Sequence, residues 1–490
     1  MRKLLLASSA VLSASLGLAS VASAQAPAPA PGTISVRLNG LVRAYAAYVS
    51  DHGVDNNQSG YINAANTAQN GLGTTNAAGQ VTALSGGNKQ ANYTFENYAR
   101  LYPGFDGVAA NGLKYGASLE IRQDQASGAG GGIYGSPSQQ NRARAGLYFR
   151  REFGYLGTDQ LGTVRVGSTD QATSLYITGT FENFDGGGLN GDIPGYASGA
   201  AQITWPFPDV GNLYTANKIV YLSPQFFGFD FGVSYEPSTA NTNSGNSCGT
   251  GAYEGATAVN AAGAISTTNP FATGATANGV SGAGCDRLAS TATGDYTRRR
   301  NTFDGLIRYR GTFGPVGVAA TAAYMGSGRV LDSSTPQRTL QYDGLSVGDF
   351  GAALTAYGFS FGGHYTFGRF NNQYQSLLPN GADDSEAWLA GISYTTGPFV
   401  MGAHYLNYKY SSNVAASLAG RQRQDVGIAA GATYSLVPGV TLFASYVFQQ
   451  ARNNGVNLVT GQTIEQDANA GRLHNKETSN VFGLGTSFRW

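Results

Sequence analysis

The last ten residues of the chain, Val481–Trp490, alternate strictly in polarity. One parity holds Phe482, Leu484, Thr486, Phe488 and Trp490, and the other holds Val481, Gly483, Gly485, Ser487 and Arg489. Because successive side chains of a β-strand point to opposite faces, this segment is predicted to be a strand with one apolar face. Similar alternation, bounded by turn residues, recurs in about sixteen segments along the chain.

Hydrophobic residues follow this alternation and never form a long run after the N-terminus. Beyond residue 24 there is no window of about 18 apolar residues, so no membrane helix is predicted there. Charged residues make up 12% of the chain, about half the usual share, while glycine (70), tyrosine (29) and phenylalanine (24) are abundant. This composition excludes a soluble α/β enzyme. The formal net charge of +1 gives no support for nucleic-acid binding.

The N-terminus has the three-part pattern of a secretory signal peptide. Arg2 and Lys3 precede an apolar stretch, residues 4–18, and Ala22-Ser23-Ala24 provides a small-residue cleavage site. A retained membrane helix is the alternative, but the stretch is short for one. The predicted organisation is a signal peptide (1–24), a short Ala/Pro linker (25–32) and a single barrel domain (33–490).

Charged residues within the predicted strands share one parity. In the segment 113–124, Lys114, Glu120 and Arg122 alternate with apolar residues, and the segment 302–311 behaves in the same way. An Arg or Lys that faces lipid near the membrane midplane costs about 2–4 kcal/mol. We therefore expect one face of each strand to contact lipid and the other to contact water.

The connections between strands alternate between short turns and long loops. Residues 396–398 and 436–439 are short turns, residues 170–216 and 237–298 are long loops, and Pro103–Gly112 is predicted to be another short turn. A soluble β-sandwich also alternates in polarity, but it does not require alternating loop lengths. The predicted fold class is therefore all-β: a transmembrane antiparallel β-barrel of about sixteen strands, with short periplasmic turns and long extracellular loops.

Several motifs resemble the trimeric general porins of Gram-negative bacteria. They are the signal peptide, the strand ISVRLNGLVRAY, the hairpin ANGLKYGASLEIR, the segments GTVRVGSTDQATSLY and NKIVYLSP, and the aromatic last residue Trp490. The resemblance covers essentially the whole mature chain. The chain departs from the family in ending with Trp instead of Phe, and in the length of its fourth loop.

The resemblance implies an exported homotrimer without cofactors in the lipid of the outer membrane, through which small hydrophilic solutes and ions diffuse passively. It also implies that the third loop, residues 170–216, folds into the lumen and narrows it. A barrel selective for sugars or anions is an alternative, favoured by aromatic residues along this loop: Tyr176, Phe181, Phe184, Tyr196 and Trp205. An outer-membrane hydrolase and a surface adhesin are less favoured.

A basic wall and an acidic loop are the candidate constriction. The inward parity of the first five strands carries Arg37, Arg43, Arg100, Lys114, Arg122, Arg142, Arg144, Arg150 and Arg165, and the third loop carries Glu182, Asp185, Asp192 and Asp209. Opposite charges on the two sides would create a transverse field at the narrowest point. In the alternative, these arginines are solvated lumen residues that pair locally with Glu96, Glu120 or Asp124.

Two further pairs of residues carry structural predictions. Cys248 and Cys285 lie in one polar loop and are predicted to form a disulfide in an oxidising compartment. Phe488 and Trp490 are predicted to lie in the aromatic girdle at the membrane surface.

Motifs for catalysis and metal binding are weak. Residues 245–249 and 344–348 match the spacing of a nucleophile elbow, but neither lies between a predicted strand and a helix, so no enzyme is predicted. Ca²⁺ at a loop is possible through the carboxylates of Asp185, Asp192, Asp383 and Asp384.

Overall fold

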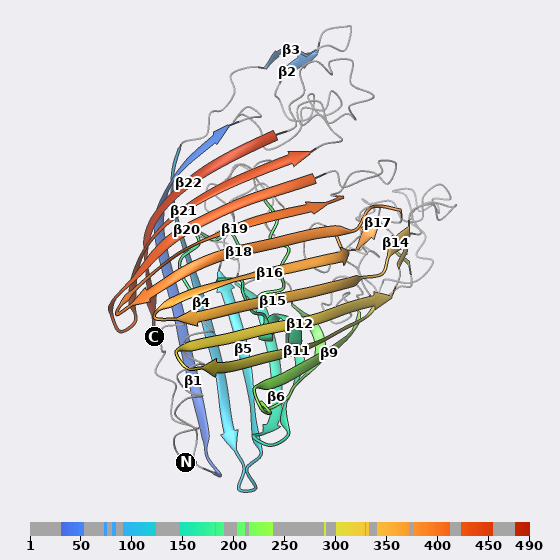
Figure 1. Cartoon of the computed structure of the whole chain (residues 1–490), viewed down its shortest axis with the longest axis vertical. Coiled ribbons are helices and arrows are strands. Elements are labelled where there is room, and N and C mark those ends of the chain that lie inside the picture. Colours follow the sequence, from blue (N-terminus) through green and yellow to red (C-terminus); the bar gives the residue numbers. More distant parts are fainter. Residues whose placement is uncertain are drawn as a thin grey trace, which may run out of the picture.

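The computed structural model is a closed barrel with short additional strands outside it (Figure 1). It describes residues 31–52, 73–75, 81–84, 92–123, 147–181, 183–190, 203–210, 215–238, 289–290, 300–328, 330–332, 341–371, 377–379, 381–411, 423–453 and 476–490. Among these residues, no helix is long and apolar enough to cross a membrane.

Sixteen strands form the barrel, and each pairs antiparallel with both neighbours. In order around it they are β1 (Ile34–His52), β22 (Lys476–Arg489), β21 (Val440–Asn453), β20 (Arg423–Val437), β19 (Phe399–Tyr410), β18 (Ser385–Thr396), β16 (Phe359–Arg369), β15 (Ser346–Ala356), β12 (Val316–Gly328), β11 (Arg300–Phe313), β9 (Phe229–Ser238), β8 (Ala216–Leu222), β7 (Gly162–Thr169), β6 (Tyr148–Thr158), β5 (Lys114–Gln123) and β4 (Tyr93–Val108). The predicted all-β barrel of about sixteen strands is confirmed.

Among the residues that the structure describes, six short strands lie outside the barrel. β2 (Gly73–Thr75) pairs with β3 (Val81–Leu84), and β10 (Ala289–Ser290), β13 (Val330–Asp332), β14 (Gln341–Asp343) and β17 (Leu378–Pro379) form a small four-stranded sheet. They belong to the long connections and take no part in closing the barrel.

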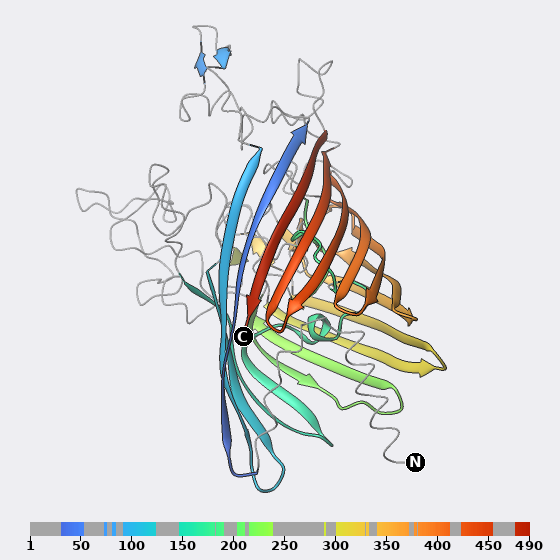
Figure 2. The same cartoon turned by 90° about the vertical axis from the view of Figure 1, so that its left-hand side faces the viewer.

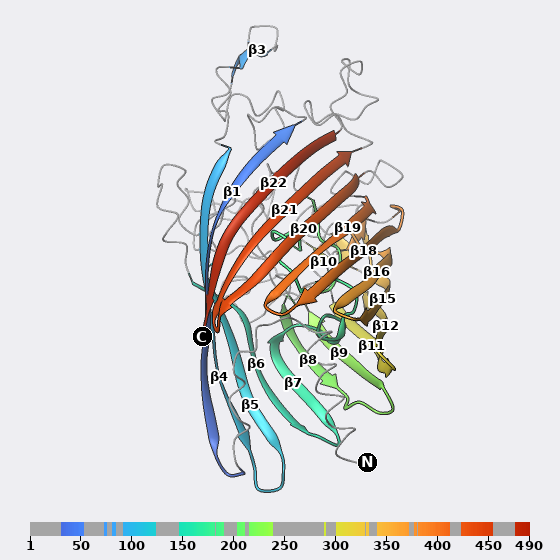
Figure 3. The same ribbon diagram turned by 60° about the vertical axis from the view of Figure 1, so that its left-hand side comes forward.

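The first and last strands close the barrel. β1 and β22 run side by side in Figure 3, and their register pairs Leu41 with Arg489. The ladder continues to the last residue, because Gly40 and Trp490 exchange backbone hydrogen bonds of 3.1 and 3.2 Å. Closure leaves no unpaired edge among these strands, which is what a barrel in a bilayer requires.

β4 is longer than the sequence indicated. The predicted turn at Pro103–Gly112 is wrong, because β4 continues to Val108 and the turn is confined to residues 109–113. Pro103 cannot donate a backbone hydrogen bond, and the β4–β5 ladder skips it between Leu101 and Gly104. The strand therefore tolerates a residue that usually ends one.

The outer and inner faces differ as the alternation predicted. On β11, Phe303 and Ile307 are exposed on the outer face, whereas Asp304 and Leu306 are buried on the inner face. Aromatic side chains line the outer face from β9 to β21, and they include Phe231, Phe350, Phe361, Trp388 and Tyr434. The main buried apolar cluster lies inside the barrel, where the third loop packs against the wall.

Candidate functional site

The third loop begins with a short helix packed on the inner wall. α2 (Ala172–Tyr176) contacts β8, β9 and β11 and lies inside the barrel (Figure 2). Thr173 donates to Asp304 of β11 through its backbone nitrogen (2.8 Å) and its hydroxyl (2.6 Å). Ser234 of β9 hydrogen-bonds to the same carboxylate. Burial on the wall raises the pKa of Tyr176, so this phenol stays protonated, and it donates to the Ser223 carbonyl at 3.3 Å.

The loop then follows the wall toward β18. His364 of β16 lies with Nδ1 2.8 Å from the Thr178 carbonyl and Nε2 2.6 Å from Asp349. Further along, Asn183 donates to the Ser393 hydroxyl of β18 at 2.6 Å. The first contact joins the loop to β16 and the second joins it to β18. The loop is therefore held along its course as well as at its ends.

Glycines in the wall make room for the loop. A Cβ added at Gly431 of β20 would overlap the Asp185 carbonyl oxygen, and one at Gly402 of β19 would overlap the Phe184 ring. Both glycines lie on strands whose outer faces carry large apolar residues, such as Met401. Because these two positions have no side chain, the loop lies directly against β19 and β20. We call this contact surface, at Gly402 and Gly431, the seat of the loop.

The returning part of the loop packs over the same strands. The backbone nitrogen of Thr204 donates to Asp425 of β20 at 2.9 Å, and Tyr410 donates to the same carboxylate at 3.0 Å. Trp205 and Phe207 are buried, with ring centroids 5.1 Å apart. Trp205 and Phe207 therefore help to hold the third loop against the barrel wall.

One ion pair joins the tip of the third loop to the first strand. Arg43 of β1 pairs with Asp185. The Arg43 guanidinium also lies 3.8 Å from the ring centroid of Phe443, which holds its orientation. These two residues of the predicted basic wall and acidic loop are therefore in direct contact.

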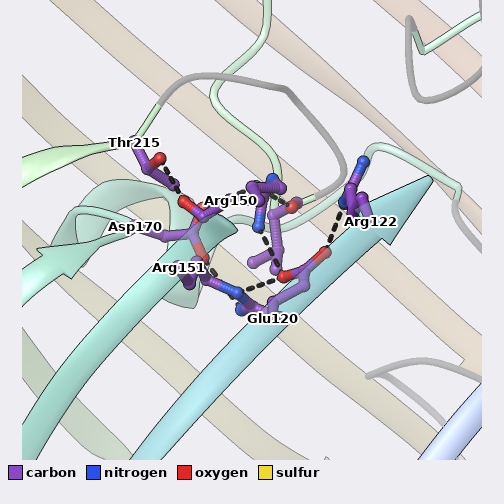
Figure 4. Close-up of polar contacts among 7 residues, drawn as sticks. Glu120, Arg122, Arg150, Arg151, Asp170 and Thr215 are labelled. Carbon is purple, nitrogen blue, oxygen red and sulfur yellow. Dashed lines mark hydrogen bonds and ion pairs between the residues drawn. The ribbon is translucent and has the colours of Figure 1, made fainter. Parts of the chain in front are cut away.

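A second ionic cluster surrounds Glu120 of β5 (Figure 4). Its carboxylate pairs with Arg122 (2.5 Å), Arg150 (3.0 Å) and Arg151. Arg150 and Arg151 also pair with Asp170, at 2.8 and 2.9 Å, where the third loop begins. For Arg122 and Arg150 this is the local pairing that the sequence left open as an alternative.

A β-bulge explains why two consecutive arginines reach one carboxylate. The β5–β6 register shifts at this point, with Glu120 opposite Arg151 and Ile121 opposite Phe149. Arg150 is the extra residue, so both arginines face inward. With Arg150 facing inward, strict alternation would place Arg151 on the outer face, and nothing in the sequence signals the bulge.

The remaining described members of the basic wall lie apart from the loop tip. Arg37 pairs with Asp106 across β1 and β4, and Lys114 pairs with Asp159 at 2.5 Å in an exposed position. Arg100 is buried, and its guanidinium lies 4.6 Å from the ring centroid of Tyr98. The guanidinium of Arg165 lies 5.0 Å from the ring centroid of Phe153. Asp209 of the third loop is also buried.

Several predicted site residues lie outside the described residues. They are Arg142, Arg144, Glu182, Asp192, Cys248 and Cys285. Phe488 and Trp490 are described, and both are about half exposed on the outer surface near the short turns. In the described part of the chain, no three carboxylate, histidine or cysteine side chains gather as a metal site would require.

A further charged group, which is not part of the predicted constriction, lies on β9 and β11. Arg308 and Arg310 both pair with Asp230, at 2.8 and 2.7 Å. The Arg308 guanidinium stacks 3.8 Å from the ring centroid of Tyr176 in α2. The alternation had placed both arginines on the polar parity, but their proximity to the third loop depends on the closed barrel.

Comparisons with solved structures find porin barrels of low sequence identity. The anion-selective porin from Comamonas acidovorans is 15% identical, with 94% of this chain and 100% of that chain covered and a TM-score of 0.49. OmpT of Vibrio cholerae in its trimer form is 11% identical, with 94% and 100% covered and a TM-score of 0.47. Salmonella typhi OmpF in complex with daunomycin is 13% identical, with 93% and 97% covered and a TM-score of 0.48.

The comparison with protein families is decisive. No curated protein matched the chain in sequence. The family described as Gram-negative porin matches residues 7–454, which is most of the chain. The chain therefore belongs to the Gram-negative porin family and is an outer-membrane channel for passive diffusion.

Proposed function

We propose that small hydrophilic solutes and ions pass between the third loop and the basic wall with only a weak preference for anions. The observation that carries this proposal is the balance of charge on the inner wall. Arg43 is paired with Asp185, and the arginines around Glu120 are shared between that residue and Asp170. Because paired charges largely cancel at a distance, they leave little field to select ions.

Besides the three arginines that share Glu120 and Asp170, two other places in the described part of the inner wall hold more positive than negative charge. Among the residues described, Arg165 of β7 contacts an aromatic ring and has no carboxylate within ion-pair distance. Arg308 and Arg310 share the single carboxylate of Asp230. These unbalanced charges would raise the local concentration of anions without binding any one of them tightly.

Removing this surplus should shift ion preference toward cations. A unit charge about 10 Å from a passing ion contributes roughly 0.4 kcal/mol in water, and screening at 0.1 M salt lowers this to about 0.15 kcal/mol. Because the charge attracts anions and repels cations, it changes their permeability ratio by about 1.7-fold. The variant Arg165→Gln with Arg310→Gln should therefore change the cation-to-anion permeability ratio about threefold at 0.1 M salt. Reversal potentials across a salt gradient measure this, and the shift should shrink at 1 M salt, where the Debye length is about 3 Å.

The matched control removes two positive charges from the outer face. Arg369 and Lys409 are exposed there, so Arg369→Gln with Lys409→Gln should leave the permeability ratio nearly unchanged. An equal shift in both variants would show that net charge, and not position in the lumen, sets ion preference.

Solute-selective transport is not favoured by the described aromatic residues of the loop. Phe184 and Trp205 are buried against the wall, near His404. We expect candidate sugars at millimolar concentration to leave the single-channel current unblocked.

We also propose that the chain forms a homotrimer that buries the outer face of β5–β8. Glu152 of β6 lies opposite Leu119 and Ser168 on the outer face, between the exposed apolar residues Phe149 and Leu156. A carboxylate within the apolar band is unfavourable against lipid. Next to it, Gly154 reduces the bulk of the same face, so a second copy could approach closely.

Photo-crosslinking tests this arrangement. A photoreactive amino acid in place of Ser168 should crosslink to a second copy of the chain in native membranes. The same amino acid in place of Ala322, on the outer face of β12 beside the exposed Tyr324, should give monomers only. Crosslinks at position 322 and none at 168 would contradict the proposed interface.

A further inference from the structure

Five outward-facing polar residues form one row across the last five strands of the barrel. The cross-strand register pairs Glu386 with Lys409, Lys409 with Gln424, Gln424 with Arg452, and Arg452 with Lys476. The row runs over β18, β19, β20, β21 and β22, which lie side by side in Figure 3. Residues that face one another in register point to the same side of a sheet.

The row lies just beyond the apolar band, at the end of the barrel that carries the long loops. On β19 the outward residues are Phe399, Met401, Ala403 and Tyr405, followed by Asn407 and Lys409. Tyr405 packs on Trp388 with ring centroids 5.0 Å apart, as expected in an aromatic girdle. Lys409 is four residues further, about 13 Å along the strand. This places the row at the level of lipid headgroups in the extracellular leaflet.

The two cations at the end of the row, Arg452 and Lys476, repel each other. Arg452 and Lys476 are exposed and directly opposite each other, and like charges in this position are destabilising. Within the part of the chain that the structure describes, neither residue is paired with a carboxylate. Glu386 lies at the other end of the row, opposite Lys409. An anion between Arg452 and Lys476 would remove the repulsion.

Other parts of the same rim lack this feature. At the extracellular ends of β9, β11, β12 and β15, the described outward side chains are neutral and bond to one another. Tyr235 donates to Asn301 at 2.8 Å, and the hydroxyls of Tyr324 and Ser346 are 3.1 Å apart. Among the described outward side chains of these four strands, this rim therefore carries no cation.

We propose that Arg452 and Lys476, with Gln424 and Lys409 beside them, bind the phosphate groups of a phosphorylated lipid headgroup in the extracellular leaflet. An arginine fork can hold two phosphate oxygens, and lysine adds a point charge next to it. Acyl chains of the same lipid would lie along the apolar band below, over Phe448 and Phe482 of these two strands. The site uses outward residues, so it is independent of how ions pass through the lumen.

Binding of bisphosphorylated lipid A to the purified full-length protein in detergent tests this proposal. The variant Arg452→Gln with Lys476→Gln should bind this lipid at least tenfold more weakly, while its single-channel conductance stays at the wild-type value. Dephosphorylated lipid A should bind the wild-type protein weakly. Its affinity should match that of bisphosphorylated lipid A for the variant. Inorganic phosphate at about 1 mM should not displace the lipid, because each exposed ion pair is worth only about 0–1 kcal/mol and free phosphate lacks the acyl chains that add to the binding.

The matched control removes one arginine and one lysine at the opposite end of the barrel. Lys114 and Arg489 are exposed near the short turns, and Lys114→Gln with Arg489→Gln changes the net charge by the same amount. Its lipid affinity should stay within twofold of the wild type. Unchanged affinity in the Arg452/Lys476 variant, or an equal loss in the control, would overturn the proposal. Displacement by inorganic phosphate would do the same, since it would identify a free-anion site.

Discussion

Replacing Glu120 with glutamine should markedly lower the stability of the folded barrel. The substitution keeps the size of the side chain but removes the carboxylate that Arg122, Arg150 and Arg151 share. Asp170 then remains as the partner of two of these three guanidinium groups. Breaking a buried ion pair costs about 3–5 kcal/mol because it leaves uncompensated charge. The urea midpoint, followed by the difference in gel mobility between folded and heated protein, should fall accordingly.

Two comparisons separate this effect from a general loss of charge. Asp159→Asn breaks the exposed pair with Lys114 and should cost less than about 1 kcal/mol. Combining Glu120→Gln with Arg151→Gln removes one of the uncompensated cations, so the double variant should be more stable than Glu120→Gln alone. If Glu120→Gln unfolds at the same urea concentration as Asp159→Asn, the cluster does not stabilise the barrel.

Alternation predicted which face of most strands is polar, and together with the alternating lengths of the connections it was enough to recover the architecture. On β11 the order of Asp304, Ile307 and Arg308 is sufficient, because a lipid-facing charge is costly and one slip in register would invert every side chain. The same reasoning fails wherever the backbone departs from a regular strand. The bulge at Arg150 brings Arg151 to the inner face, and Pro103 lies within a strand instead of ending one.

The path of the third loop could be predicted only in outline. The resemblance implied that residues 170–216 enter the lumen, but not which strands they contact. That path depends on pairs far apart in the chain, such as Asn183 with Ser393 and Thr204 with Asp425. Asn, Ser and Thr are common in any barrel lumen, so their sequence positions carry no information about partners. Gly402 and Gly431, which form the seat of the loop, could not be singled out from the sequence either, because the chain has 70 glycines.

The seat of the third loop can be tested by filling it. In Gly431→Val, the added side chain would occupy the space of the Asp185 carbonyl, and backbone on both sides leaves it no room to move aside. The loop tip should leave the wall, breaking the Arg43–Asp185 pair that depends on its position. We expect the single-channel conductance to change by roughly a third, because a shift of the loop inside the lumen alters the width of the aqueous channel that a sixteen-stranded barrel leaves.

Because overpacking can also destabilise a barrel, the control must add the same side chain elsewhere. Gly305 of β11 faces outward, and a Cβ there would make only an ordinary contact with Val233 at 3.7 Å. Gly305→Val should therefore keep both the conductance and the urea midpoint of the wild type. Adding Asp185→Asn to Gly431→Val should lower the urea midpoint no further, because the ion pair that Asp185 makes with Arg43 is already broken. If Gly431→Val folds normally and conducts like Gly305→Val, the loop tip is not seated on β20 in the open channel.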